Sequence, residues 1–360
     1  MRIALICILQ LHKNSGSART AYENIHYFRK KGYEVHVASM TMDKDFVLSE
    51  GAIPHKVLPW IKSTGMMRRK WYNFQIELLK KKLKPEVVMG HGDIANQDVL
   101  TLHNSVFLAS ELIHGRPLKP TDEMYQIHGP LLREQKFKKL IANSNLMKED
   151  CIARFKIPAE KIHVVYPALD TKTFFPQPEK KAELRRRFGF GDDKVVVALV
   201  TSGNFKKRGL DLFSEAIEKL PSELKDKATF RVIGKDKPLP GLTPLIQFDP
   251  ELVDIENYFR AIDVYVLPAR IEEFGRVVIE AMGCGLPVIT TDKVGAGELL
   301  EGESRRGVIP SHDAQALSNA MAELIADPAL RTRLGKLNAS SILKNSEDKV
   351  YSHFDQVFER

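Results

Sequence analysis

The chain has 360 residues, which is too long for one ordinary domain and suits two of about 170 each. With 43% hydrophobic and 28% charged residues, its composition is that of a globular protein and excludes the disordered and collagen-like classes. No apolar run approaches the roughly eighteen residues that a membrane span needs. The net charge of +8 is concentrated in residues 1–170, where 26 Lys and Arg stand against 17 Asp and Glu, whereas residues 171–360 carry 28 against 29. This imbalance suits an interaction with a polyanion or an anionic membrane surface, and it equally suits solubility alone.

Short apolar runs alternate with helical patterns along the first half of the chain, as in the βα units that build parallel sheets. The first run, residues 3–9, leads into a Gly/Ser turn and a helix pattern, so it predicts a buried strand and not a signal peptide. A polar stretch at residues 171–178, bracketed by Pro176 and Pro178, predicts a linker. Strands are predicted at residues 2–8, 34–39, 86–90, 98–103, 139–142 and 162–166, and helices at residues 17–31, 68–84, 124–136 and 145–155.

The same alternation restarts after the linker. Strands are predicted at residues 195–201, 229–233, 244–248, 263–267, 287–291 and 307–309, and helices at residues 209–220, 251–261, 276–284, 313–326 and 330–343. In the last segment, residues 347–359, Tyr351, Phe354 and Phe358 recur at helical spacing, so one aromatic face must be buried. We therefore expect an α/β protein with two Rossmann-like, doubly wound domains that face each other across a cleft.

The three cysteines, Cys7, Cys151 and Cys284, are an odd number, lie far apart and sit in apolar patterns. Their spacing is that of reduced core residues and not of a disulfide framework or a metal site, so we expect a cytoplasmic protein. No acidic metal-binding triplet is evident either, and we expect neither a metal ion nor another cofactor.

Residues 268–288, PARIEEFGRVVIEAMGCGLPV, join a predicted strand to a predicted helix, so the turn lies at the carboxyl edge of a parallel sheet, where α/β proteins bind ligands. Gly275 allows a ligand to approach the backbone, and the N–H groups of the first helical turn suit a diphosphate. Glu280 lies roughly 7 Å further along the helix axis, where a carboxylate meets ribose hydroxyls, and Glu272 lies across the turn, where it meets sugar hydroxyls. This order predicts a nucleotide diphosphate-sugar, and a surface acid beside a capping acid is the plainer alternative.

This stretch resembles the E-x7-E signature of glycosyltransferase family 4, a family of retaining enzymes with the GT-B fold, in its form E-x-F-G-x4-E-A-M-x-x-G-x-P-V. The resemblance implies that Glu272 holds the donor sugar and that Glu280 holds the ribose. Glu273 stands where the family usually has glycine. This leaves open whether Glu272 or Glu273 faces the donor, and the spacing favours Glu272.

A second stretch, TSGNFKKRGL at residues 201–210, joins a predicted buried strand to a helix. A cation at a helix N-terminus is poorly placed for helix stability, so an anion nearby is a reasonable inference, and solvated loop cations are the plainer alternative. The stretch resembles the family's strand–loop–Lys-Gly segment, whose lysine neutralises the leaving diphosphate. Arg208 stands at that lysine position with Lys207 beside it, and arginine can bind phosphate bidentately, so the resemblance does not decide between them.

In the first half, residues 14–18, NSGSA, resemble the family's glycine loop, whose N–H groups face the donor phosphates, and Gly16 takes that place. The loop is not G-x-G-x-x-G, which counts against a dinucleotide dehydrogenase. His103 ends the predicted strand 98–103, where the family has a histidine that touches the donor sugar and the acceptor site; a lone histidine there is otherwise structural. Ser144 fits the family's small polar residue in the same cleft.

The resemblance covers nearly the whole chain and implies an acceptor-binding domain at residues 1–172 and a donor domain at residues 173–342. It also implies that residues 343–360 form a helix that crosses back to the N-terminal domain. Residues 203–209 and 236–238 look most like those of bacterial lipopolysaccharide core glucosyltransferases.

We therefore expect retaining transfer of a hexose, glucose or a related sugar, from a UDP-linked donor to a glycan acceptor such as lipopolysaccharide core or a lipid-linked saccharide. The alternatives are a GDP-mannose-dependent mannosyltransferase, a non-hydrolysing nucleotide-sugar epimerase and, in another class, a non-catalytic glycan-binding protein on a membrane surface. The side chains expected to act in catalysis are Glu272, Arg208, Lys207 and His103. The residues expected to bind the nucleotide are Gly16, Gly203, Phe274, Gly275, Arg276, Val277 and Glu280.

The helix predicted at residues 68–84 mixes cations with Trp71, Phe74 and Leu78. It fits a peripheral contact with the anionic inner face of the membrane, and it equally fits a helix that packs on the core. Phosphate groups on a lipopolysaccharide core offer another explanation for the positive charge. No recognised nucleic-acid-binding module is present, so we expect no nucleic-acid partner.

Overall fold

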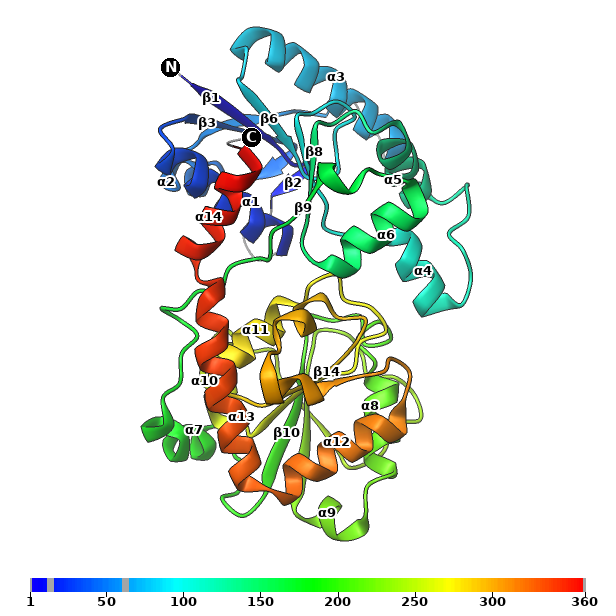
Figure 1. Ribbon diagram of the computed structural model, residues 1–360, viewed down its shortest axis with the longest axis vertical. Helices are drawn as coiled ribbons and strands as arrows, with labels where there is room; N and C mark the ends of the chain where they lie inside the picture. The colour runs from blue at the N-terminus through cyan, green and yellow to red at the C-terminus, as the bar shows by residue number, and fades with distance from the viewer. Residues whose placement is uncertain (1, 12–15, 60–64, 359–360) are drawn as a thin grey trace. The chain divides into compact units, whose positions relative to one another are not determined.

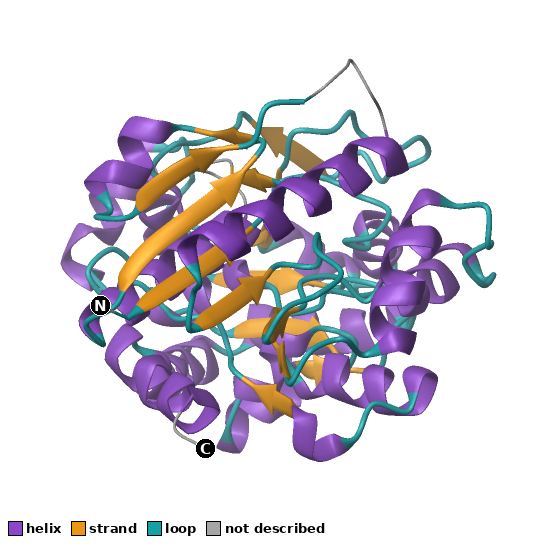
Figure 2. Cartoon of the chain, turned by 90° about the horizontal axis from the view of Figure 1, so that it is seen from above, coloured by secondary structure: helices purple, strands orange, loops and turns teal. Residues whose placement is uncertain are grey.

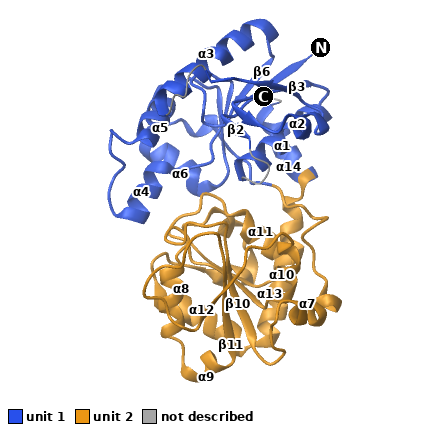
Figure 3. Ribbon diagram, turned by 180° about the vertical axis from the view of Figure 1, so that it is seen from behind, with its two compact units in different colours: residues 1–167, 348–360 blue, residues 168–347 orange. Residues whose placement is uncertain are grey.

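The structure, a computed structural model, describes residues 2–11, 16–59 and 65–358. The chain forms two compact units, which we call unit 1 (Met1–Pro167 with Asp348–Arg360) and unit 2 (Ala168–Glu347; Figure 3). The units divide after residues 167 and 347, where the sequence placed boundaries after residues 172 and 342.

Unit 1 is built on a parallel sheet of seven strands in the order β5-β3-β1-β6-β7-β8-β9. The chain order of the strands reverses between β1 and β6, as in other doubly wound sheets. Figure 2 shows the strands side by side with helices outside them. The strands are β1 (Ile3–Cys7), β3 (Glu34–Ser39), β5 (Ile53–Lys56), β6 (Val87–Gly90), β7 (Val99–Thr101), β8 (Lys139–Ala142) and β9 (Ile162–Val164), and β2 (Gln10–Leu11) pairs apart with β4 (Thr41–Met42). The helices are α1 (Gly16–Lys30), α2 (Lys44–Ser49), α3 (Gly65–Leu83), α4 (Val106–His114), α5 (Glu123–Glu134), α6 (Asn145–Phe155) and α14 (Glu347–Phe358).

The last helix, α14, packs on α1 within unit 1 (Figure 1). The ring of Tyr27 lies 5.2 Å from that of Phe354 and 5.5 Å from that of Phe358. The Tyr27 hydroxyl also donates to the Asp355 carboxylate at 2.9 Å. The aromatic face of this segment is therefore buried against the first helix of the chain.

Unit 2 is built on a parallel sheet of six strands in the order β12-β11-β10-β13-β14-β15. All residues of the central strands β10 and β13 except Val195 are buried, as expected when helices cover both faces of a sheet. The strands are β10 (Val195–Val200), β11 (Ala228–Ile233), β12 (Ile246–Asp249), β13 (Val264–Leu267), β14 (Val288–Thr291) and β15 (Val308–Ile309). The helices are α7 (Lys181–Arg187), α8 (Leu210–Glu218), α9 (Ser222–Asp226), α10 (Ile255–Ala261), α11 (Arg276–Gly283), α12 (Ala314–Ala326) and α13 (Pro328–Ser341).

Both sheets and the long helices were predicted, and the differences lie in short elements. The structure adds β5 and the helices α2, α4, α7 and α9, each nine residues or fewer, because segments of that length carry little periodicity. The prediction of a strand at residues 98–103 was wrong at its C-terminal end, since β7 stops at Thr101. The Leu102 N–H still donates to Ile141 O at 3.0 Å, and His103 lies beyond the strand in the loop that follows.

Within the described ranges, no helix combines the length and the apolar composition that a bilayer crossing requires.

Candidate active site

The loop after β13 carries Glu272 and is bound to the loop after β14. The Glu272 N–H donates to Lys293 O at 2.9 Å, and the Glu272 carbonyl accepts from the Gly295 N–H at 3.0 Å. Gly275 has a φ of +94°, and a Cβ there would lie only 3.1 Å from Glu272 Cγ. The backbone therefore requires glycine at this turn and fixes the position from which the Glu272 side chain extends.

Helix α11 begins directly after Gly275. Gly275 supplies no side-chain cap to the start of this helix, and a helix N-terminus is a place where anions bind. Phe274 is buried at the turn, Arg276 and Val277 are half-buried, and Glu280 is 7% exposed further along the helix. The nucleotide-binding residues predicted in this segment thus lie together at the carboxyl edge of the unit 2 sheet.

The loop between β10 and α8 reaches the same edge and depends on two glycines. A Cβ at Gly209 would lie 2.0 Å from the Pro268 carbonyl oxygen, so only glycine allows this loop to contact the end of β13. Gly203, with a φ of +136°, lies against Asp236, whose carboxylate accepts a hydrogen bond from the Asn204 N–H. This packing brings the cations of the loop between β10 and α8 close to the acids of the loop after β13.

Lys207 and Arg208 form ion pairs with the two adjacent glutamates. Lys207 Nζ lies 2.7 Å from Glu273 Oε2, and Arg208 pairs with Glu272. Arg208 Nε also donates to Thr201 Oγ1 at 3.2 Å. Burial lowers the pKa of Arg208, and the Glu273 carboxylate opposes that shift. The residue that replaces the family's glycine, Glu273, therefore has a partner of its own.

A third ion pair fixes the two loops beside these residues. Arg270 donates to both carboxylate oxygens of Asp211, at 2.7 and 2.8 Å, and to the Lys206 carbonyl at 2.7 Å. Burial alone would raise the pKa of Asp211, but hydrogen bonds from Arg270 and Lys206 lower it to about 2. The Arg270 N–H donates in addition to Lys207 O at 2.9 Å. The loops that carry the four charged side chains are thus held rigidly together.

In unit 1, Gly16 is the first residue of α1. A Cβ at this position would meet no described atom within 4 Å, so packing does not require glycine there. Asn14 and Ser15, which belong to the same predicted loop, lie outside the described residues.

His103 pairs with His91, a residue that the sequence analysis did not single out. His91 Nδ1 lies 2.8 Å from His103 Nε2, and the rings stack with centroids 5.0 Å apart. Asn24 lies 3.4 Å from the other nitrogen of His91. Burial, then the proximity of His103, lower the pKa of His91 well below its usual value. His91 directly follows β6, and its place at a strand end was the signal that could have found it.

Ser144 is the N-cap of α6, and its hydroxyl accepts from the Met147 N–H at 3.2 Å. This contact gives the residue a structural role in the helix start. Among the described residues, no three His, Cys, Asp or Glu side chains lie together as metal ligands would, and metal-independent action stays a prediction.

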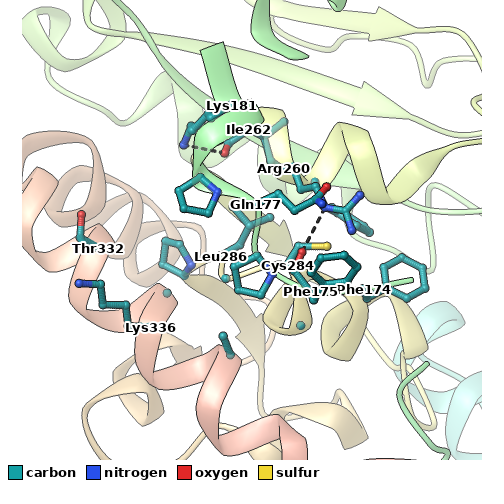
Figure 4. Close-up of a pocket in the computed structure, with 18 of the residues that line it drawn as sticks. Phe174, Phe175, Gln177, Lys181, Arg260, Ile262, Cys284, Leu286, Thr332 and Lys336 are labelled. Carbon is teal, nitrogen blue, oxygen red and sulfur yellow. Dashed lines mark hydrogen bonds between the residues drawn. The ribbon is translucent and has the colours of Figure 1, made fainter. Parts of the chain in front are cut away.

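A cavity of about 830 Å³ lies elsewhere in unit 2, where α11 ends and β14 begins (Figure 4). Its walls include Phe174, Cys284 and Leu286, with Lys181 and Lys336 at its sides. Because α11 starts at the carboxyl edge of the sheet and ends at this cavity, the cavity is separate from the site of Glu272 and Glu280.

Two comparisons identify the class of protein. The sequence model described as "Glycosyltransferase Family 4" matches residues 14–173, and that described as "Glycosyl transferases group 1" matches residues 196–327. The fold is that of GT-B glycosyltransferases: a solved structure of WaaG, a glycosyltransferase involved in lipopolysaccharide biosynthesis, has a TM-score of 0.80 and 17% identity, covering 99% of this chain and 100% of that one. HepE of Anabaena, solved in complex with UDP and glucose, has a TM-score of 0.75 and 17% identity over the whole of both chains. The chain belongs to glycosyltransferase family 4.

Curated relatives match over about half of their length. The lipopolysaccharide core biosynthesis mannosyltransferase LpsB of Rhizobium meliloti is 30% identical over 200 residues, which are 51% of this chain and 56% of the relative. A GDP-mannose-dependent phosphatidylinositol monomannoside mannosyltransferase of Mycolicibacterium smegmatis is 29% identical over 199 residues, 49% of this chain and 50% of the relative. The chain thus spans about half the length of the curated relatives it matches.

Proposed function

We propose that the protein transfers a hexose from a nucleotide diphosphate-sugar to a hydroxyl group of a glycan or glycolipid acceptor, with retention at the anomeric carbon. One observation carries this proposal: Glu272, the N-terminus of α11 and Glu280 follow one another in that order at one sheet edge, and Arg208 forms an ion pair with Glu272 there. The order suits sugar, diphosphate and ribose, with a cation beside the diphosphate.

In the proposed reaction, the bond between the anomeric carbon and the diphosphate oxygen breaks. The acceptor oxygen bonds to the same face of that carbon, and its proton passes to the leaving diphosphate. Arg208 and the N–H groups at the start of α11 stabilise the negative charge that develops on the diphosphate. Fixed donors of this kind act without rearrangement because the surrounding loops are tied by Arg270 and Asp211.

The donor we propose to test first is UDP-glucose, because the fold is shared with HepE, which was solved with UDP and glucose. GDP-mannose is the second candidate, since the Rhizobium and Mycolicibacterium relatives are named as mannosyltransferases. The experiment incubates the full chain with each donor, with and without a lipopolysaccharide core oligosaccharide or a lipid-linked saccharide. Nucleotide release that depends on the acceptor, with the anomeric configuration of the product read by NMR, supports the proposal. Release of a free 2-epimer instead would establish the epimerase alternative.

We also propose that α3 contacts an anionic membrane surface. The sequence left open whether its aromatic stripe packs on the core, and in the structure only Tyr72 and Ile76 of this helix are buried. Met67, Phe74 and Leu78, which recur along one face, are 68%, 53% and 46% exposed. The exposed cations that accompany them are Lys70, Lys81 and Lys82. Exposed apolar side chains flanked by lysines suit the interface of an anionic leaflet.

A further inference from the structure

The four charged side chains at the unit 2 site form a cluster without net charge. The cations of Lys207 and Arg208 are each matched by one carboxylate, those of Glu273 and Glu272. A diphosphate that enters such a cluster finds no cation free of a carboxylate. To engage Lys207 or Arg208, the diphosphate must therefore take that cation from its glutamate.

The two ion pairs differ in how readily they open. The Glu273 side chain is 6% exposed, whereas that of Glu272 is 16% exposed. Opening a buried pair leaves an uncompensated charge away from water, which is costly, so the pair of Lys207 with Glu273 stays closed. The pair of Arg208 with Glu272 is the one that a ligand can open.

The loop does not need to move when Glu272 releases Arg208. The N–H and the carbonyl of Glu272 are both bonded to the loop after β14, so a rotation of the side chain alone separates the carboxylate from the guanidinium. Arg208 keeps its hydrogen bond to Thr201 Oγ1 and remains in place to receive a phosphate.

We infer that donor binding is an exchange of ion-pair partners: the diphosphate takes Arg208 from Glu272, and the freed Glu272 carboxylate accepts hydrogen bonds from the sugar hydroxyls. Glu273 is a positioning residue in this exchange, because it keeps Lys207 neutralised and leaves Arg208 as the cation for the diphosphate. The inference rests on the proposed function and assigns the roles of the two glutamates and the two cations.

The exchange gives the site a means to distinguish the intact donor from the nucleoside diphosphate that remains after transfer. With a sugar present, the freed carboxylate has hydroxyl partners. Without the sugar, the same carboxylate lies unpaired beside a phosphate and competes for Arg208 again. The site is therefore expected to hold the intact donor more tightly than the product.

Calorimetry with two probe pairs, UDP with UDP-glucose and GDP with GDP-mannose, tests the exchange. In Glu272→Gln, Arg208 is no longer neutralised, so the nucleoside diphosphate should bind about tenfold more tightly while the intact donor gains nothing. Glu273→Gln should also tighten nucleoside diphosphate binding, because Lys207 becomes available, and Lys207→Met with Glu273→Gln should restore the wild-type ratio of the two dissociation constants. A residue with a structural role alone would leave that ratio unchanged.

Glu301→Gln is the matched control, since Glu301 forms an exposed pair with Lys344. Thermal unfolding of each variant shows whether it is folded. If Glu273→Gln alone does not fold, the double variant serves in its place, because it removes both charges of that ion pair and leaves no unpaired charge. If Glu272→Gln weakens the nucleoside diphosphate and the intact donor equally, the exchange is wrong even when acceptor-dependent transfer is observed. If the wild type binds neither probe pair, the proposed function fails and the exchange fails with it.

Discussion

His91 and His103 stack against each other at the carboxyl edge of the unit 1 sheet, with a ring nitrogen of one 2.8 Å from a ring nitrogen of the other. The contact joins the loop after β6 to the loop after β7. Since His91 is 7% exposed and its pKa is lowered, the pair contains at least one neutral imidazole at pH 7. A proton on His91 would place a charge in a buried position.

Stability should therefore fall in mildly acidic solution. Burial, then the Arg69 charge, lower the pKa of His128 to about 4, and that of His91 is lowered as well. The pKa of each histidine is lower in the folded chain than in the unfolded chain, where it is about 6.5. The contribution of each to stability is therefore fully present above pH 6.5 and is lost as pH falls toward 4. For His128 the loss amounts to about 3 kcal/mol at most. Thermal unfolding across this range should show a smaller decline in His128→Gln than in the wild type, and His114→Gln, at an exposed position, should not change the decline.

Glu280→Gln should weaken donor binding with little effect on the chemical step. The proposed contact with the ribose is made equally in the ground state and the transition state, so KM for the donor should rise about tenfold while kcat stays within a factor of a few. Steady-state rates of acceptor-dependent nucleotide release measure both constants. A fall in kcat with an unchanged KM would contradict a ribose contact for Glu280.

Arg208→Ala should weaken donor binding and, unlike Glu280→Gln, should also slow the chemical step. Because Arg208 stabilises charge that develops on the leaving diphosphate, its loss should lower kcat by about 100-fold or more. Arg208→Lys, which restores the family's residue, should recover part of the rate because a point charge remains. Equal rates for the alanine and lysine variants would show that the positive charge at this position does not serve the reaction.

The membrane contact predicts a loss of vesicle binding when the α3 stripe is made polar. Phe74→Ser with Leu78→Ser should reduce sedimentation with vesicles that contain anionic lipid, and Lys81→Glu with Lys82→Glu should do the same at low salt. Leu343→Ser, an exposed apolar residue of unit 2, is the control and should not change binding. Binding of the wild type to neutral vesicles with equal strength would rule out the role of the lysines.

Truncation of the α14 contact should destabilise unit 1. Phe354 is buried against Tyr27, and Phe354→Ala should lower the free energy of unfolding by about 3–5 kcal/mol. Tyr27→Phe removes only the hydrogen bond to Asp355 and should cost about 1 kcal/mol. Denaturant titrations followed by circular dichroism measure both effects, and a loss for Phe354→Ala no larger than that for Tyr27→Phe would contradict the packing.

The sequence predicted the parts of the molecule that depend on local pattern. Alternating strands and helices indicated both sheets, and the turn at Gly275 was located because a ligand-binding turn has its own residue spacing. Pairings across the fold leave no such pattern. Nothing in the order of residues shows that Glu273 meets Lys207, or that His91 meets His103, because each pair joins loops that follow different strands.

The position of α14 in unit 1 determines when that unit can be completed during synthesis. Its other elements lie before residue 168, yet the helix that covers Tyr27 is separated from them by the whole of unit 2. As the ribosome makes the chain, the aromatic surface of α1 stays uncovered until α14 emerges, after the whole of unit 2. Synthesis of unit 2 therefore comes before unit 1 can complete its fold.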